Sequence, residues 1–129
     1  MDPIADMLST IKNSYAVGKK KIIIPYSRPK FLLGQILVRE DFLAKVEEKE
    51  DNEGRKEIVL SLSYRGRNSA FSGFERLSKP GRRLYSRRED LPKISRRLGT
   101  VIISTPVGLL TAQEALEKNQ GGELICRIW

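Results

Sequence analysis

A polar segment in the middle of the chain, Arg65-Gly66-Arg67-Asn68-Ser69, constrains the fold more than any other feature. The chain has 129 residues, which is the length of one domain or of two small lobes. Small units bury a small share of their surface, and only 40% of these residues are apolar. We therefore predict two small lobes that need each other, residues 1–66 and residues 67–129, joined at this segment.

The first half has the apolar spacing of two helices and three short strands. Apolar side chains recur at helical spacing in two segments, and Asp2 followed by Pro3 is typical of a helix start. A β-branched run ended by Pro25 predicts a buried strand, and alternation on both sides of a polar turn predicts a hairpin. The predicted segments are helices 2–16 and 29–42 and strands 22–24, 44–49 and 56–64.

The second half has the pattern of short strands and short helices separated by glycine and proline. Pro80-Gly81 suits the centre of a type II turn between a strand and its returning partner. Thr111 and Glu114 have the spacing of a capping box, which predicts a helix start. The predicted segments are strands 70–77, 83–86, 100–104 and 124–129 and helices 89–98 and 111–118.

Nearly all of the net charge lies in residues 76–97. This segment holds nine Lys or Arg against Glu89 and Asp90, which is +7 of the whole-chain +8. A block of one sign indicates an anionic partner. A membrane-binding helix needs a strong apolar face, which residues 89–98 lack, so the segment favours nucleic acid. The cations are Arg76, Lys79, Arg82, Arg83, Arg87, Arg88, Lys93, Arg96 and Arg97.

The composition argues against several functional classes. The chain has no histidine, which removes the commonest general base and metal ligand, and no Gly-x-Ser-x-Gly nucleophile elbow. Its single cysteine, Cys126, fits a reducing cytoplasm. No apolar run approaches the roughly 20 residues that span a bilayer, and the acidic start has no signal-peptide pattern. We therefore expect a cytoplasmic protein that is not an enzyme and has no metal or cofactor.

Two features beside the basic segment have the chemistry to contact RNA. Tyr85, flanked by arginines, is by itself most simply a half-buried strand residue, but it could stack on a base or sugar. The hydroxyls of Ser104-Thr105-Pro106-Val107-Gly108 could satisfy a turn, or they could contact base edges and 2′-hydroxyls. The acidic residues of 47–53 indicate a solvated hairpin, and Cys126 a small core residue. The alternative to RNA is an adaptor for an acidic protein surface.

Six motifs run from one end of the chain to the other in a single order. They are Asp2-Pro3-Ile4-Ala5-Asp6-Met7-Leu8, Ser78-Lys79-Pro80-Gly81-Arg82-Arg83-Leu84-Tyr85, Leu91-Pro92-Lys93, Leu98-Gly99, Ser104-Thr105 and Gly121-Gly122-Glu123-Leu124-Ile125-Cys126. Together they resemble the family of small-subunit ribosomal protein eight, in its bacterial form.

The resemblance implies an α+β protein of two lobes. In the N-terminal lobe two helices pack on a three-stranded sheet, and the C-terminal lobe is a small β-structure with short helices that carries the main RNA surface. The implied function is a structural one: a monomer in the small subunit binds the central domain of the rRNA at an irregular stem. Further implied partners are small-subunit ribosomal protein five and, through autogenous repression, the mRNA of its own operon. A cytoplasmic ribosome is expected, with an organellar one left open.

The resemblance also assigns RNA contacts by position. Ser104 and Thr105 match the family's Ser-Thr-Ser turn, but here Pro106 replaces the last serine and Val107 the basic residue that follows. Because Pro106 has neither a hydroxyl nor an amide hydrogen, one expected contact is lost or taken over by a neighbour. The residues expected to read the RNA are Ser104, Thr105, Tyr85 and Glu123, with Gly121 and Gly122 beside them. The residues expected to contact phosphates are Arg82, Arg83, Arg87, Arg88 and Lys30.

Overall fold

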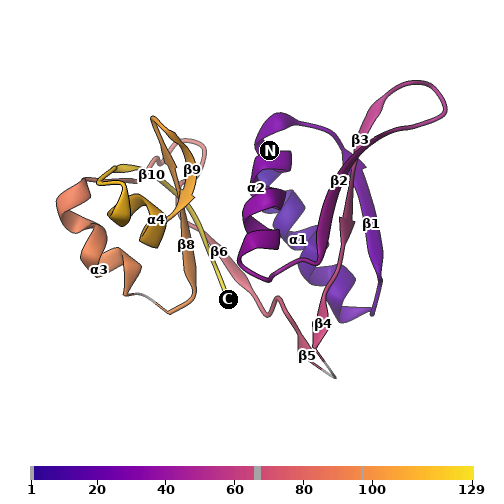
Figure 1. Cartoon of the computed structure of the whole chain (residues 1–129), viewed down its shortest axis with the longest axis horizontal. Coiled ribbons are helices and arrows are strands. Elements are labelled where there is room, and N and C mark those ends of the chain that lie inside the picture. The colour runs from indigo at the N-terminus through magenta and orange to yellow at the C-terminus, as the bar shows by residue number, and fades with distance from the viewer. Residues whose placement is uncertain (1, 66–67, 97) are drawn as a thin grey trace. The chain divides into compact units, whose positions relative to one another are not determined.

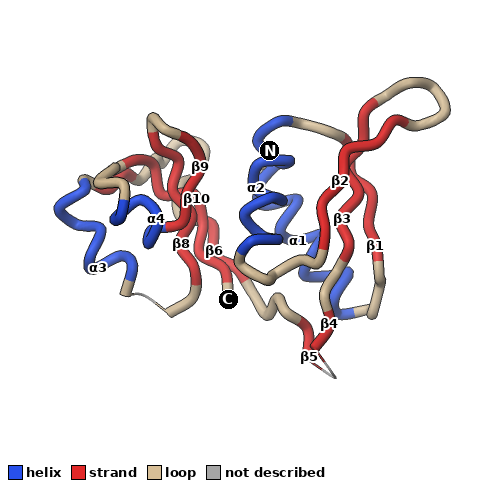
Figure 2. Tube along the Cα trace, in the orientation of Figure 1, coloured by secondary structure: helices blue, strands red, loops and turns tan. Residues whose placement is uncertain are grey.

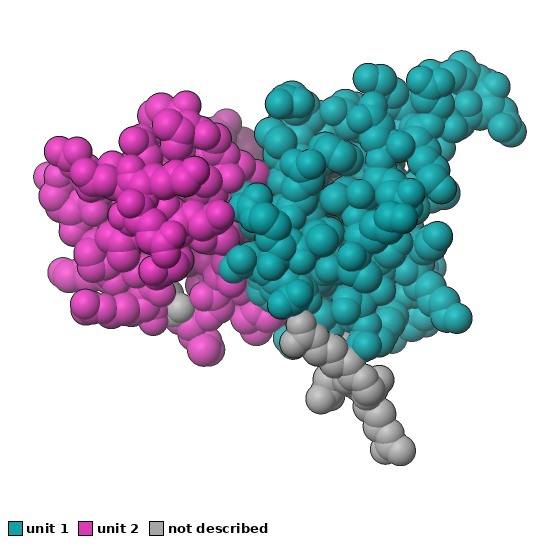
Figure 3. Space-filling model, in the orientation of Figure 1, with its two compact units in different colours: residues 1, 3–72 teal, residues 2, 73–129 magenta. Residues whose placement is uncertain are grey.

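The computed structural model describes residues 2–65, 68–96 and 98–129, which fold into two compact units (Figure 1, Figure 3). Unit 1 comprises Pro3–Ser72, and unit 2 comprises Gly73–Trp129 together with Asp2. The predicted boundary between residues 66 and 67 falls on residues outside those described, and it stays a prediction. Arg97, the last cation of the basic segment, also lies outside the described residues.

Unit 1 is two helices on one face of a three-stranded antiparallel sheet (Figure 2). The strand order is β1-β3-β2, so the hairpin places its second strand in the middle of the sheet. A short pair of strands follows, β4 and β5. The elements are α1 (Pro3–Ala16), β1 (Lys21–Pro25), α2 (Arg28–Arg39), β2 (Lys45–Glu50), β3 (Lys56–Ser61), β4 (Tyr64–Arg65) and β5 (Asn68–Ser69).

Local sequence explains where these elements begin and which side they bury. The Ser27 hydroxyl accepts from the Lys30 N–H at 3.4 Å and caps α2. The strand predicted at 22–24 is present within β1, but it is buried on one side only: Ile22 and Ile24 are buried, whereas Ile23 is 62% exposed. The helices cover only one face of the sheet, so alternate residues of β1 point away from them.

Unit 2 is built around one antiparallel sheet of the order β6-β10-β8-β9, with β7 also paired to β10. Two short helices pack on one face of this sheet. The core between the helices and the sheet contains Leu91, Val101, Ile103, Leu110, Ala112 and Ala115. The elements are β6 (Phe74–Arg76), β7 (Tyr85–Ser86), the 3₁₀ helix η1 (Arg88–Asp90), α3 (Leu91–Ser95), β8 (Thr100–Thr105), β9 (Gly108–Thr111), α4 (Ala112–Glu117) and β10 (Gly122–Ile128).

The predicted fold class, α+β in two small lobes, is confirmed, and several element predictions need correction. Strands 70–77 and 83–86 do not pair with each other along their length. The shorter β6 and β7 instead lie one after the other on the same side of β10. The predicted helix 89–98 is split into η1 and α3, and β9 was not predicted. The capping box of Thr111 and Glu114 is confirmed. None of the described helices is long and apolar enough to cross a membrane.

Candidate nucleic-acid interface

The register of the unit 2 sheet gathers three predicted site residues into one row. Glu123 pairs with Tyr85 on one side and with Ser104 on the other, and Ser104 pairs with Leu109. Directly paired residues of an antiparallel sheet point to the same face. Ile103, the neighbour of Ser104, points into the helix-covered core, so this row lies on the opposite face. We call these four residues, Tyr85, Glu123, Ser104 and Leu109, the outer row.

Two members of the outer row correct or extend the sequence prediction. Tyr85 is 70% exposed, so the alternative of a half-buried strand tyrosine is wrong and its ring is open to stacking. Leu109 is partly exposed beside Ser104 and was missed. The only signal in the sequence was the apolar pair Leu109-Leu110 after a glycine, which indicates a strand but not which residue faces outward.

Gly121 and Gly122 make the close packing of this row possible. A Cβ on Gly122 would lie 2.0 Å from the Ser104 carbonyl oxygen, and one on Gly121 would lie 2.5 Å from the Ser86 carbonyl oxygen. Only glycine allows backbone to approach this closely. The two glycines therefore allow the start of β10 to lie against the backbone of Ser86, in the basic segment, and against the backbone of Ser104 on the other side.

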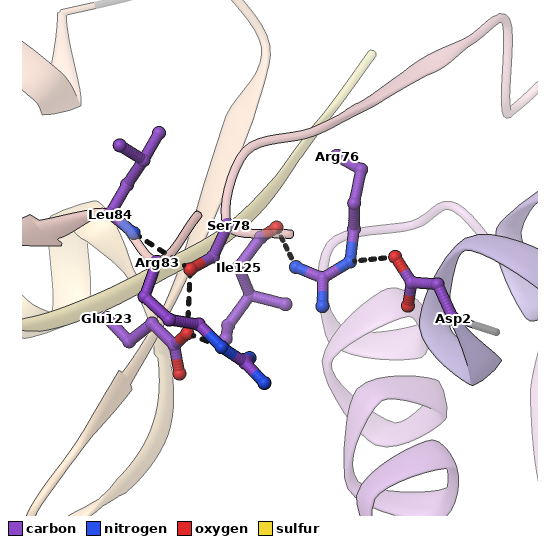
Figure 4. A network of polar contacts seen from close by, with 7 residues as sticks. All are labelled: Asp2, Arg76, Ser78, Arg83, Leu84, Glu123 and Ile125. Atoms are coloured by element: carbon purple, nitrogen blue, oxygen red, sulfur yellow. Dashed lines mark hydrogen bonds and ion pairs between the residues drawn. The ribbon is translucent and has the colours of Figure 1, made fainter. Parts of the chain in front are cut away.

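The Glu123 carboxylate is held by side chains of its own chain (Figure 4). The Ser78 hydroxyl donates to Glu123 Oε2 at 2.7 Å, and Arg83 Nη1 lies 3.2 Å from the same oxygen. The Leu84 N–H donates to Ser78 Oγ at 2.9 Å. Farther along β6, Arg76 donates to Asp2 at 2.9 Å and to the Ile125 carbonyl. Glu123 is thus part of a structural network as well as of the outer row.

The two hydroxyls of the strand end have different surroundings. Thr105 Oγ1 donates to the Gly108 carbonyl at 2.7 Å and accepts from the Val107 N–H at 3.2 Å. Its one proton is therefore used within the turn, as the simpler of the two interpretations predicted. The exposed Ser104 hydroxyl has no partner in the described part of the chain. Ser104 is consequently the hydroxyl that is free to donate to a ligand.

The predicted phosphate-binding arginines lie in the segments before and after β7 rather than along a strand. Arg82 and Arg83 lie in the loop before β7, where the Lys79 and Arg82 backbones exchange two hydrogen bonds across Pro80-Gly81. Gly81 has a φ of 81°, as the predicted type II turn requires. None of these arginines lies on a strand, because β7 contains only Tyr85 and Ser86.

Two arginines are paired with acidic neighbours on the surface. Arg87 lies 3.5 Å from Asp90, and Arg88 lies 3.4 Å from Glu89. The Glu89 backbone hydrogen bond and then the Arg88 guanidinium hold the pKa of Glu89 below its ordinary value. Ion pairs that are exposed to solvent in this way are weak, so a phosphate can displace them.

Lys30, the remaining predicted phosphate contact, belongs to unit 1. It lies in the first turn of α2 and borders an open pocket of about 310 Å³ whose other lining residues include Asp6, Thr10 and Ile24. Unit 2 alone carries the outer row and the four predicted arginines.

The remaining titratable groups offer no second site in the described residues. No group of three or more potential metal ligands occurs in ranges 2–65, 68–96 and 98–129. Glu47 and Glu48 of the acidic hairpin pair with Lys45 at 3.6 Å and Lys56 at 3.3 Å. Burial raises the pKa of Cys126 to about 12, and this free cysteine is the core residue that was predicted.

Comparison with known proteins identifies the family. A family model described as ribosomal protein S8 matches residues 2–129. Relatives named small ribosomal subunit protein uS8 include those of Sorangium cellulosum, Clostridium novyi and Streptococcus equi subsp. zooepidemicus, which are 43, 41 and 44% identical to this chain. Each alignment covers 99% of this chain and 97 or 98% of the relative. As its motifs indicated, the chain belongs to the ribosomal protein S8 family.

Proposed function

We propose that this chain, a structural protein of the small ribosomal subunit by its family, binds the central domain of small-subunit rRNA directly through unit 2. The outer row carries the proposal: it combines an exposed aromatic ring, a free hydroxyl and a carboxylate within one patch of sheet. Sequence-specific RNA recognition uses stacking and hydrogen bonds to bases that an irregular stem exposes. Because the chain belongs to this family, it is not an enzyme.

The proposal separates attraction from discrimination. Arg82, Arg83, Arg87 and Arg88 contact phosphates, together with Lys30 of unit 1, and they supply affinity that does not depend on sequence. The outer row supplies the contacts that distinguish an irregular stem from a regular duplex. Ser104 donates to a base edge or a 2′-hydroxyl, and Tyr85 stacks. Thr105 stabilises the turn through its two hydrogen bonds. Glu123 accepts a hydrogen bond from a base amino group through Oε1, because Ser78 and Arg83 both contact Oε2.

The same surface accounts for one of the two further partners that we propose. A stem of similar shape in the mRNA of the protein's own operon would compete for the outer row, which is the physical basis of autogenous repression. Small-subunit ribosomal protein five is proposed as the neighbour in the assembled particle. The RNA-binding lobe is proposed to comprise residues 67–129.

A Ser104→Ala substitution is expected to weaken binding of the irregular rRNA stem about tenfold, because one hydrogen bond to RNA is lost. Binding of a regular RNA duplex of equal length should change less than about twofold, since phosphate contacts remain. The free energy of unfolding should stay within about 0.5 kcal/mol, because Ser104 is exposed and its hydroxyl makes no bond to the described residues. Filter binding or calorimetry with both RNAs measures the difference.

Thr105→Ala is the matched comparison. It removes both turn hydrogen bonds, so we expect the free energy of unfolding to fall by about 1 kcal/mol along with the affinity for the stem. Equal losses on the stem and the duplex for Ser104→Ala would show that Ser104 does not discriminate. Binding of neither RNA by the natural chain would contradict the proposed function and favour an acidic protein partner.

A further inference from the structure

We propose that Ser78 is a positioning residue for the RNA surface: its buried hydroxyl holds Glu123 and the loop of residues 79–83 in the arrangement that binds RNA. The inference rests on the proposed function and adds to it a residue that contacts no RNA itself. Ser78 is fully buried, whereas Lys79, Arg82 and Arg83 that follow it are all exposed.

The loop of residues 79–83 is closed at its base by Ser78. The Leu84 N–H donates to Ser78 Oγ across six positions at 2.9 Å, while the Ser78 N–H donates to the Leu124 carbonyl at 3.0 Å. The Leu124 N–H donates in turn to the Leu84 carbonyl at 2.9 Å. Both ends of the loop are therefore anchored on β10, and the side-chain hydroxyl in that anchor is that of Ser78 (Figure 4).

The direction of the hydrogen bonds gives the hydroxyl a specific task. A serine hydroxyl has one proton, and here it goes to Glu123 Oε2 at 2.7 Å while the oxygen accepts from Leu84. Glu123 Oε2 also accepts a hydrogen bond from Arg83 Nη1 at 3.2 Å. Ser78 thus holds the Glu123 carboxylate in place, and the carboxylate in turn holds the Arg83 guanidinium. Arg83 lies two residues before the start of β7 at Tyr85.

Two consequences follow for RNA binding. Arg83 is held in one direction, so less of its rotamer freedom is lost when a phosphate binds. Tyr85 begins β7 opposite Glu123, so the loop closure also sets the position of its exposed ring. An alanine at position 78 leaves the Leu84 N–H and one side of Glu123 without a partner.

The experiment is a double-mutant cycle of Ser78→Ala and Glu123→Ala, titrated with the irregular rRNA stem at several salt concentrations, with variants shown to be folded by circular dichroism. Each single variant is expected to bind about tenfold more weakly, and the double variant no more weakly than the weaker single one. The salt slope should become shallower by about 1 in each, because Arg83 no longer reaches its phosphate.

Two control variants separate positioning from general destabilisation. Ser95→Ala removes a hydroxyl that donates to the Pro92 carbonyl at 3.1 Å within α3, and it should bind the stem within about twofold of the natural chain. Ser78→Thr keeps the hydroxyl and should bind within about threefold.

The outcomes are decisive in either direction. Additive losses in the double variant, an unchanged salt slope, or an equal effect of Ser95→Ala would overturn the role of Ser78. If Ser78→Ala does not fold, Glu123→Ala decides alone: tighter binding with an unchanged slope would mean that Glu123 merely repels phosphate. Failure of the natural chain to distinguish stem from duplex would instead overturn the proposed function.

Discussion

Gly122→Ala is expected to lower the free energy of unfolding by about 3 kcal/mol or more and to abolish preferential binding of the irregular stem. The added Cβ would lie 2.0 Å from the Ser104 carbonyl oxygen, and it would also meet the Ile103 side chain at 3.1 Å. Backbone atoms of a paired strand cannot move aside without breaking the pairing of β10 with β8. Chemical denaturation and stem binding measure the two losses.

The control for this variant is Gly54→Ala in the hairpin of unit 1. Gly54 has a φ of 78°, but a Cβ added there would have no atom within 4 Å, so alanine meets only backbone strain of about 1–2 kcal/mol. RNA binding should be unaffected. A Gly122→Ala variant no less stable than Gly54→Ala would contradict the close approach of the two strands.

Local signals predicted the elements whose causes are local. The capping box of α4 needs only Thr111 and Glu114, and the structure contains both of its hydrogen bonds. The Pro80-Gly81 turn likewise depends on two adjacent residues and their preferred dihedral angles. The hairpin of β2 and β3 follows from alternation on both sides of one polar turn.

Pairing over long sequence distances was not predictable in the same way. The choice of β10, rather than β6, as the partner of β7 depends on residues that are far apart in the sequence, Tyr85 and Glu123, and no local pattern records it. A similar distance along the chain separates Arg83 from Glu123. The family resemblance therefore suggested that Glu123 reads the RNA, but no local pattern in the sequence indicated that Ser78 and Arg83 hold its carboxylate.

Side-chain roles depend on the same distant geometry. Ser104 and Thr105 are equivalent candidates in the sequence, because both are hydroxyls at the end of an apolar strand. The return of β9 places the Gly108 carbonyl beside Thr105 and so engages one hydroxyl while leaving the other exposed. Residue type and spacing thus indicated Tyr85, Ser104 and Thr105 as candidates, and the fold separates the hydroxyl engaged in the turn from the one that is exposed.

Raising the salt concentration from about 50 to about 200 mM is expected to weaken binding of the irregular stem about 250-fold, on a slope of roughly −4. This slope corresponds to about five phosphate contacts. The five proposed contacts are Arg82, Arg83, Arg87, Arg88 and Lys30. Affinity measured at four or more salt concentrations gives the slope directly.

The ion pairs on the surface make this slope informative about mechanism. Arg87 and Arg88 each lie within 3.5 Å of a carboxylate oxygen, whereas no salt bridge of Arg82 occurs among the described residues. If these two pairs persisted in the complex, only Arg82, Arg83 and Lys30 would neutralise phosphates, and the same change in salt would weaken binding about thirtyfold. We expect the steeper response, because exposed pairs are too weak to exclude a phosphate.

Single charge removals test whether the contacts are local. Arg82→Ala should make the slope shallower by about 1, whereas Lys12→Ala, which removes a cation from the exposed side of α1, should leave it unchanged. Equal changes for the two variants would mean that the net charge of the chain attracts RNA without defined contacts. A flat salt response of the natural chain would contradict phosphate binding by the basic segment altogether, since released counterions are the source of the slope.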